Sequence, residues 1–167
     1  MDLDVAVNVS AQQLDHKNFA ESITSALEEA GVSASSLILE LTESTFLHAS
    51  PLTLQSLARL SDLGVRWSLD DFGTGYSSFA YLNQFSLDRL KIDKSFVNDL
   101  AIDPKARSIV RAMINLGHNL DMRVIAEGVE TQQQLDVLRE LDCEYFQGFL
   151  KSTAVTPGSV IEMAHST

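Results

Sequence analysis

"SLDDFGTGYSSF", residues 68–79, is the stretch that decides how the chain is organised, because two adjacent carboxylates end an apolar run and glycines follow at once. Asp70 and Asp71 repel each other, and successive side chains of a strand point to opposite faces. Both carboxylates can face one site only if the strand ends there and the chain turns. Gly73 and Gly75 are predicted to supply that turn and to let the loop approach a ligand closely.

Six apolar runs, this one included, are predicted to be strands. They are rich in β-branched and aromatic residues and mostly lack clean alternation, which is typical of strands buried on both faces of a parallel sheet. Amphipathic helical patterns lie between most of them. The predicted strands are residues 5–9, 37–41, 66–70, 89–93, 123–127 and 145–149, and the predicted helices are residues 19–31, 51–64, 104–120 and 131–142. Thr131 is a predicted N-cap, with Gln134 in the capping-box position.

Strands that alternate with helices indicate an α/β fold built of βα units. Two architectures satisfy this pattern, an open doubly wound sheet and a barrel. A complete (β/α)8 barrel usually takes about 250 residues and eight strands. With 167 residues and six predicted strands, the chain is about two units short of such a barrel.

Composition limits the classes of partner. The net charge of −11, from 23 acidic and 12 basic residues, argues against a nucleic-acid polymer, because phosphate backbones are bound by excess Lys and Arg. A small phosphorylated ligand stays possible if the acids hold metal ions that meet its charge. Cys143 is the single cysteine, which excludes an internal disulfide and a thiolate metal cluster. We expect a cytoplasmic protein, since the sequence has no membrane segment and no basic-then-apolar leader.

Polar residues stand at the carboxyl end of every predicted strand, where βα folds place their catalytic groups. They are Asn8, Glu40, Asp70, Asp71, Lys91, Asp93, Glu127 and Gln147. In adjacent parallel strands these groups converge, and carboxylate and amide oxygens are the ligands of Mg²⁺ and Mn²⁺.

Two other interpretations of these strand ends stay open. Asp, Asn and Ser often follow strands as helix caps, although Glu40, Lys91 and Glu127 are not favoured cap residues. Buried charges need ions or each other, so Lys91 also fits a structural ion pair with Asp93 or Glu127.

Six motifs occur in an order that resembles the EAL domain, a family of bacterial phosphodiesterases that hydrolyse cyclic di-GMP. The motifs are "NVSAQQL" (8–14), "ELTES" (40–44), "DDFGTGYSS" (70–78), "KIDKSF" (91–96), "IAEGVET" (125–131) and "FQGF" (146–149). The resemblance runs from about Val5 to Phe149 and implies a TIM-type (β/α)8 barrel that is incomplete at its N-terminus, with about six βα units present. Residues 1–167 would form one such domain, N-terminally truncated.

The resemblance also implies site roles and a reaction, the hydrolysis of cyclic di-GMP to linear pGpG with two divalent cations, Mg²⁺ or Mn²⁺. Lys91 and Glu127 match the residues that hold and activate the attacking water. The implied metal ligands are Asn8, Glu40, Asp70, Asp71 and Glu127, with Asp70 bridging the two cations. The residues implied to support the loop or the substrate are Glu43, Gly73, Thr74, Gly75, Asp93, Glu130 and Gln147.

Two departures from the family pattern stand out. The Glu-Ala-Leu signature, whose Glu is a metal ligand and which is followed by a substrate-binding Arg, is missing, and Met1 stands only a few residues before the Asn8 strand. The stretch "KSTAVTP" (151–157) has Thr153 and Ala154 where the family usually has a basic residue and Pro after Ser. We therefore expect the last strand and the final loop to differ.

Three hypotheses about function remain from the sequence. The first is a metal-dependent cyclic di-GMP phosphodiesterase, and the intact acid motifs favour it. The second is a module that binds cyclic di-GMP or a protein without catalysis. The third is an incomplete piece with little activity alone, whose open sheet edges favour association, so that a homodimer is expected.

Overall fold

The fold is one parallel sheet of six strands in the order β1-β2-β3-β4-β5-β6, in a computed structural model that describes residues 3–75, 82 and 85–165. Each strand pairs in parallel with the next one along the chain. The strands are β1 (Val5–Asn8), β2 (Leu37–Thr42), β3 (Arg66–Phe72), β4 (Arg89–Ile92), β5 (Arg123–Ala126) and β6 (Tyr145–Phe146). All six predicted strands are confirmed.

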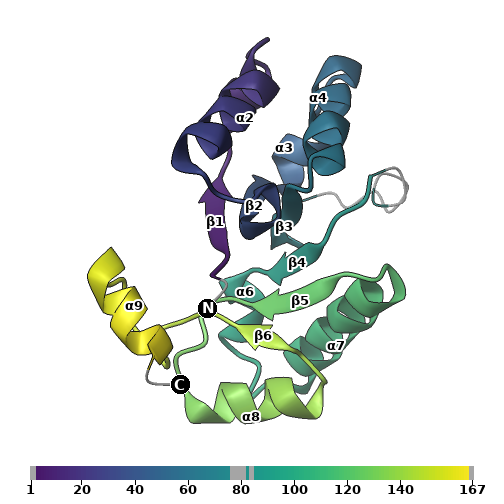
Figure 1. Ribbon diagram of the computed structural model, residues 1–167. Coiled ribbons are helices and arrows are strands. Elements are labelled where there is room, and N and C mark those ends of the chain that lie inside the picture. Colours follow the sequence, from purple (N-terminus) through teal and green to yellow (C-terminus); the bar gives the residue numbers. More distant parts are fainter. Residues whose placement is uncertain (1–2, 76–81, 83–84, 166–167) are drawn as a thin grey trace.

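The sheet curls into a half-barrel with helices outside it, which confirms the expectation of an incomplete (β/α) barrel (Figure 1). The four predicted amphipathic helices are confirmed as α2 (Phe19–Ala30), α4 (Pro51–Asp62), α7 (Pro104–Asn119) and α8 (Gln132–Glu140). The capping box at the start of α8 is also present, because the Thr131 hydroxyl accepts the Gln134 N–H while the Gln134 side chain accepts the Thr131 N–H. No described helix is both long and apolar enough to cross a membrane.

Five further helical segments, which the sequence analysis did not predict, complete the described fold, although a capping box of Ser10 and Gln13 marks the start of the first. They are α1 (Ala11–Leu14), η1 (Ala34–Ser36), α3 (Glu43–Leu47), α6 (Lys94–Val97) and α9 (Pro157–His165). All except α9 have five residues or fewer, which is too short for a helical period to be recognised.

The hydrophobic core lies between the outer face of the sheet and the helices. Alternation along β2 turns Leu39 and Leu41 toward this core and Glu40 toward the inner face of the half-barrel. Trp67 is fully buried, and its indole N–H donates to Ser61 Oγ at 2.9 Å. Burial of such a side chain stabilises the fold by about 1.5–3 kcal/mol. Apolar packing on the outer face of the sheet therefore fixes the position of the polar side chains on its inner face.

The two edge strands leave the half-barrel open on one side. Every residue of β1 is exposed, and Val5 and Val7 have 56% and 43% of their surface accessible. At the other edge β6 has only two residues, and Tyr145 is 46% exposed. No other described strand pairs with β1 or β6 on their free sides. An edge strand presents a row of unpaired N–H and C=O groups, so these two edges are free to pair with further strands.

Candidate functional site

Lys91 forms the centre of a buried ionic cluster on the inner face of the sheet. Its Nζ lies 2.7 Å from Glu127 Oε1 and 2.9 Å from Glu40 Oε2. A third carboxylate oxygen, Asp70 Oδ1, lies 3.1 Å away. The four side chains come from the ends of β2, β3 and β4 and from the residue after β5, and the Lys91 side chain is only 5% exposed. The sheet therefore brings four of the predicted strand-end residues into contact.

Two residues of the cluster, Lys91 and Glu127, have pKa values above their usual values. Burial lowers the pKa of Lys91, but the hydrogen bonds to Glu127 and Glu40 outweigh it, and the pKa ends well above its usual value. Burial raises the pKa of Glu127, assisted by the charges of Asp70 and Glu40 and opposed by Lys91. The contacts of Lys91 thus favour its charged form, and the surroundings of Glu127 favour its protonated form more than those of an ordinary glutamate.

A bulge in β3 explains how two adjacent aspartates reach one site. Leu69 pairs with Leu90 and Phe72 pairs with Ile92, so two residues of β3 face the single residue Lys91 of β4. Asp71 has a φ of 56°, a left-handed conformation that costs a non-glycine residue about 1 kcal/mol.

This geometry corrects the turn expected from the sequence. The strand does not end at Asp70 but continues to Phe72, and the change of direction begins at Asp71 itself. Gly73, with a φ of 95°, comes after the bulge and not in place of it. The carboxylates were correctly placed together, but the reason is a bulge that a sequence pattern does not reveal.

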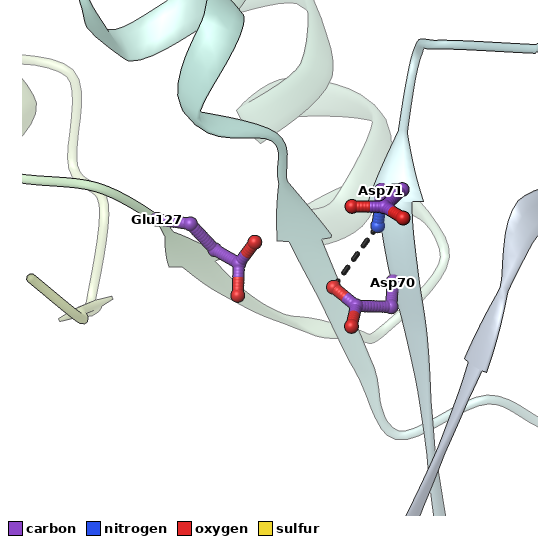
Figure 2. A group of neighbouring side chains, drawn as sticks. All are labelled: Asp70, Asp71 and Glu127. Atoms are coloured by element: carbon purple, nitrogen blue, oxygen red, sulfur yellow. Dashed lines mark hydrogen bonds between the residues drawn. The ribbon is translucent and has the colours of Figure 1, made fainter. Parts of the chain in front are cut away.

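Asp70, Asp71 and Glu127 form a group with carboxylate oxygens within 4.8 Å of one another (Figure 2). The backbone N–H of Asp71 donates to Asp70 Oδ1 at 3.0 Å, which fixes the Asp70 carboxylate against the backbone of the bulge. Burial raises the pKa of Asp71, and the charges of Asp70 and Asp93 add to that effect, opposed by Lys91 and Lys94.

The residues present fit a divalent cation. Three carboxylates, those of Glu40, Asp70 and Glu127, pair with the Lys91 ammonium, and Asp71 lies beside them. Lys94 adds a second positive charge near Asp71, so among the described residues four acids stand against two cations. Hard cations such as Mg²⁺ and Mn²⁺ take oxygen ligands of this kind and offset the repulsion between them.

Two predicted residues stand at the rim of the site. Asn8 ends β1 as the register partner of Glu40, and it is exposed because no described strand covers that edge. Gln147 follows β6, its N–H donates to Ala126 O at 2.8 Å and its carbonyl oxygen accepts the Val129 N–H. Both lie at the carboxyl end of the sheet, as expected from their strands.

Glu43 connects α3 to the glycine loop that follows the bulge. It is buried, and its Oε2 accepts the Gly73 N–H at 3.0 Å. The Thr74 hydroxyl donates to Asp71 O at 2.8 Å, and Gly75 lies so close that a Cβ there would be 3.2 Å from Glu43 Oε1. Residues 73–75, the part of the loop that the structure describes, therefore pack against the buried Glu43 carboxylate.

The remaining two predicted site residues make contacts typical of helix caps. Asp93 caps α6, with its Oδ1 accepting the Ser95 N–H at 3.0 Å. Burial raises the pKa of Asp93, but the Ser95 hydrogen bonds and the Lys94 charge outweigh it and lower the pKa. Glu130 is exposed, and its N–H donates to Gln134 Oε1 at 2.9 Å.

Ser68 was missed by the sequence analysis. It is fully buried on β3, beside Glu40 in register, and its Oγ has no hydrogen-bond partner among the described residues. It stands two residues before Asp70, so the strand period places both side chains on the same face. From this two-residue spacing to Asp70, Ser68 could have been predicted to face the site.

Comparison with known families gives one match over most of the chain. The family described as "EAL domain" matches residues 1–154. The cyclic di-GMP phosphodiesterase NbdA of Pseudomonas aeruginosa is 46% identical over 150 residues, which is 90% of this chain and 19% of NbdA. This chain therefore spans about a fifth of the length of that curated relative.

Solved structures show the same architecture. The phosphodiesterase of MucR, in complex with c-di-GMP, superposes with a TM-score of 0.89 at 42% identity, over 94% of this chain and 64% of that one. BlrP1 of Klebsiella pneumoniae, in a complex with manganese and cy-diGMP, has a TM-score of 0.83 at 29% identity, over 89% of this chain and 38% of that one.

Proposed function

The chain belongs to the EAL domain family, and on that premise we propose that it is a metal-dependent phosphodiesterase that hydrolyses cyclic di-GMP to linear pGpG. The observation that carries the proposal is the Lys91 ammonium within 3.1 Å of three carboxylates, with Asp71 as a fourth beside them. Similar proteins include NbdA, a cyclic di-GMP phosphodiesterase, and the MucR phosphodiesterase in its c-di-GMP complex.

Two divalent cations, Mg²⁺ or Mn²⁺, would polarise the phosphate oxygens and make a bound water more acidic. The residues that would hold them are Asn8, Glu40, Asp70, Asp71 and Glu127. Asp70 and Asp71 suit a shared site because the bulge presents both on one side, near Glu127.

Hydrolysis adds one water to one phosphodiester of the ligand. The water oxygen bonds to phosphorus, the bond from phosphorus to a ribose oxygen breaks, and that oxygen leaves with a proton. Glu127 accepts a proton from the attacking water, for which its place beside Lys91 and the two aspartates suits it. Lys91 stays charged and stabilises the negative charge that develops on the phosphate oxygens.

The loop residues support this chemistry from outside the cluster. Glu43 holds Gly73 in place, and Thr74 hydrogen bonds to the Asp71 carbonyl, so the loop fixes the bulge. Asp93 orients α6 by capping it, Glu130 precedes α8, and the Gln147 backbone holds the strand end that carries Glu127 through its bonds to Ala126 and Val129. We assign these residues to positioning.

A binding-only module is the second candidate, favoured by the exposure of Asn8 at the open edge of β1. A site open on that side holds a cation less firmly. We further propose that residues 1–167 act as one EAL-type domain, and that the open edges take up further strands or a second copy in a homodimer.

The experiment is incubation with cyclic di-GMP in H₂¹⁸O with Mg²⁺ or Mn²⁺, followed by mass spectrometry of the product. We expect pGpG with one ¹⁸O on its terminal phosphate. Calorimetric binding of cyclic di-GMP without any product would support the binding-only module instead. Absence of both binding and product would contradict the proposed ligand.

A further inference from the structure

One short segment, from Ile92 at the end of β4 to Phe96 in α6, touches both loops that carry the carboxylate group. The Ile92 carbonyl oxygen accepts the Glu127 N–H at 3.1 Å. Lys94 and Phe96, the next alternate residues, lie against glycines of the two loops. The segment thus spans the space between the Asp71 bulge and the Glu127 strand end.

The contact with the first loop is at Gly73. A Cβ built on Gly73 would lie 2.5 Å from Met113 Cε and 2.9 Å from Phe96 Cε2. Distances this short show that the backbone rests directly on these two side chains, with no space between them. Phe96 and Met113 are themselves packed against the main core, so the support is anchored.

The contact with the second loop is at Gly128, the residue after Glu127. Gly128 has a φ of 66°, and a Cβ there would lie 2.6 Å from Lys94 Cβ. The backbone of this loop therefore rests on the stem of Lys94, in the same way that Gly73 rests on the Phe96 ring. Two residues of the same short helix α6 thus lie one against each loop.

Several contacts hold the bulge at Asp71, whose φ of 56° lies in the left-handed region. Asp121 and Asp142 have a similar φ in turns that follow helices, so it is the contacts around Asp71, and not its φ alone, that mark this position. The bulge is fixed by the Asp70 carboxylate, the Thr74 hydroxyl and, through Gly73, Glu43. Gly73 is also in contact with the Phe96 ring and with Met113 Cε.

We propose that Phe96 is a positioning residue that holds the β3 bulge at the distance from Glu127 at which Asp70, Asp71 and Glu127 bind one divalent cation. The inference rests on the proposed function only in assuming that this group binds metal. Without the ring, the Gly73 backbone drops into the vacated space, the bulge relaxes, and the Asp71 carboxylate moves away from Glu127.

The test compares Phe96→Ala and the milder Phe96→Leu with the wild-type protein. In metal-free protein, amide hydrogen exchange of Gly73 and Thr74 is expected to accelerate by about 10-fold in Phe96→Ala, because local opening becomes easier. Mn²⁺ affinity, measured by calorimetry, is expected to fall by about 10–100-fold, as for other lost supporting contacts around a metal. Phe96→Leu should lie between the two.

The matched control is Phe19→Ala, which removes a buried ring at the start of α2. It should lower the unfolding midpoint without changing exchange at Gly73 and Thr74 or the affinity for Mn²⁺. If Phe96→Ala fails to fold, Phe96→Leu carries the same comparison.

The two proposals fail in different ways. Unchanged exchange and unchanged Mn²⁺ affinity in the Phe96 variants would overturn the positioning role, whether or not the wild type hydrolyses cyclic di-GMP. No hydrolysis by a wild type that binds Mn²⁺ through this group would overturn the proposed reaction and leave the role of Phe96 standing.

Discussion

Lys91 Nζ lies 2.7 Å from Glu127 Oε1, and this ion pair joins the carboxyl ends of two neighbouring parallel strands. It confirms one of the two partners expected for Lys91 from the sequence, whereas Asp93 caps a helix instead. The pair is not a simple structural link, since Glu40 and Asp70 bind the same ammonium. The Lys91 ammonium thus lies among carboxylates that also fit a divalent cation.

Replacing Lys91 with Met is expected to destabilise the fold. Three carboxylates lose their shared counterion, and breaking a buried ion pair in this way costs about 3–5 kcal/mol. Urea denaturation of Lys91→Met and of the exposed control Lys105→Met measures the difference. Mn²⁺ should restore part of the lost stability, because it offsets the same charges. Equal unfolding free energies for the two variants would mean that the cluster does not need its ammonium.

Replacing Gly73 with Ala is expected to destabilise the loop and lower metal affinity. The residue has a φ of 95°, and a Cβ would lie 2.5 Å from Met113 Cε, so both strain and a clash result. We expect a loss of about 1–3 kcal/mol in unfolding free energy. Gly158→Ala is the control, since a Cβ at that position in α9 meets nothing within 4 Å. Thermal melts that do not distinguish the two variants would show that Gly73 tolerates a side chain.

Replacing Asp4 with Asn is expected to loosen the edge strand β1 in a pH-dependent way. Hydrogen bonds from Arg66 lower the pKa of Asp4 despite some burial, and Arg89 Nη2, 2.7 Å from Asp4 Oδ2, adds to the effect. Because the folded pKa is lowered, its stabilisation is present above the unfolded value of 3.8 and is lost as the pH falls through the folded pKa.

The measurement is the melting temperature of Asp4→Asn at two pH values. At pH 7 we expect a decrease of about 2–4 °C relative to the wild type, and near pH 2 we expect the difference to vanish. The control is Asp99→Asn, at an exposed position. A deficit that is the same at both pH values would assign the effect to packing and not to charge.

Replacing Val7 with Lys is expected to weaken self-association. Val5 and Val7 are exposed on an unpaired edge strand, and a lysine on such an edge opposes pairing with another chain. Size-exclusion chromatography with light scattering should give a dimer for the wild type and a shift toward monomer for Val7→Lys. A monodisperse wild-type monomer would contradict the proposed homodimer.

The strands, and the convergence of their terminal residues, could be predicted from the sequence for a physical reason. Buried parallel strands are nearly continuous apolar runs, and a charged residue such as Lys91 or Glu127 at the end of such a run needs a partner. The half-barrel could be predicted because the sequence has six strand patterns, fewer than the eight of a complete barrel, and the sheet has six strands.

The features that could not be predicted from the sequence depend on tertiary contacts. The bulge contains a left-handed Asp71, a conformation that aspartate adopts more often than most residues but that no sequence pattern marks. The support beneath it comes from a four-residue helix too short to show a period, with Phe96 lying under a glycine 23 positions earlier in the chain. The cap that Asp93 forms could not be told from a ligand in the sequence, because the two have the same side chain at the same strand end.

The most direct test is a time course of cyclic di-GMP hydrolysis by the wild type and by Glu127→Gln, each with Mn²⁺ and with a chelator. We predict pGpG formation by the wild type with Mn²⁺, loss of it with the chelator, and a decrease of about 100-fold or more in Glu127→Gln, the range for a lost general base. Glu127→Gln should remain folded, because it keeps the size and a hydrogen-bonding oxygen near Lys91. Equal rates in the two proteins, or no pGpG from a folded wild type with Mn²⁺, would contradict a phosphodiesterase site at Lys91 and Glu127.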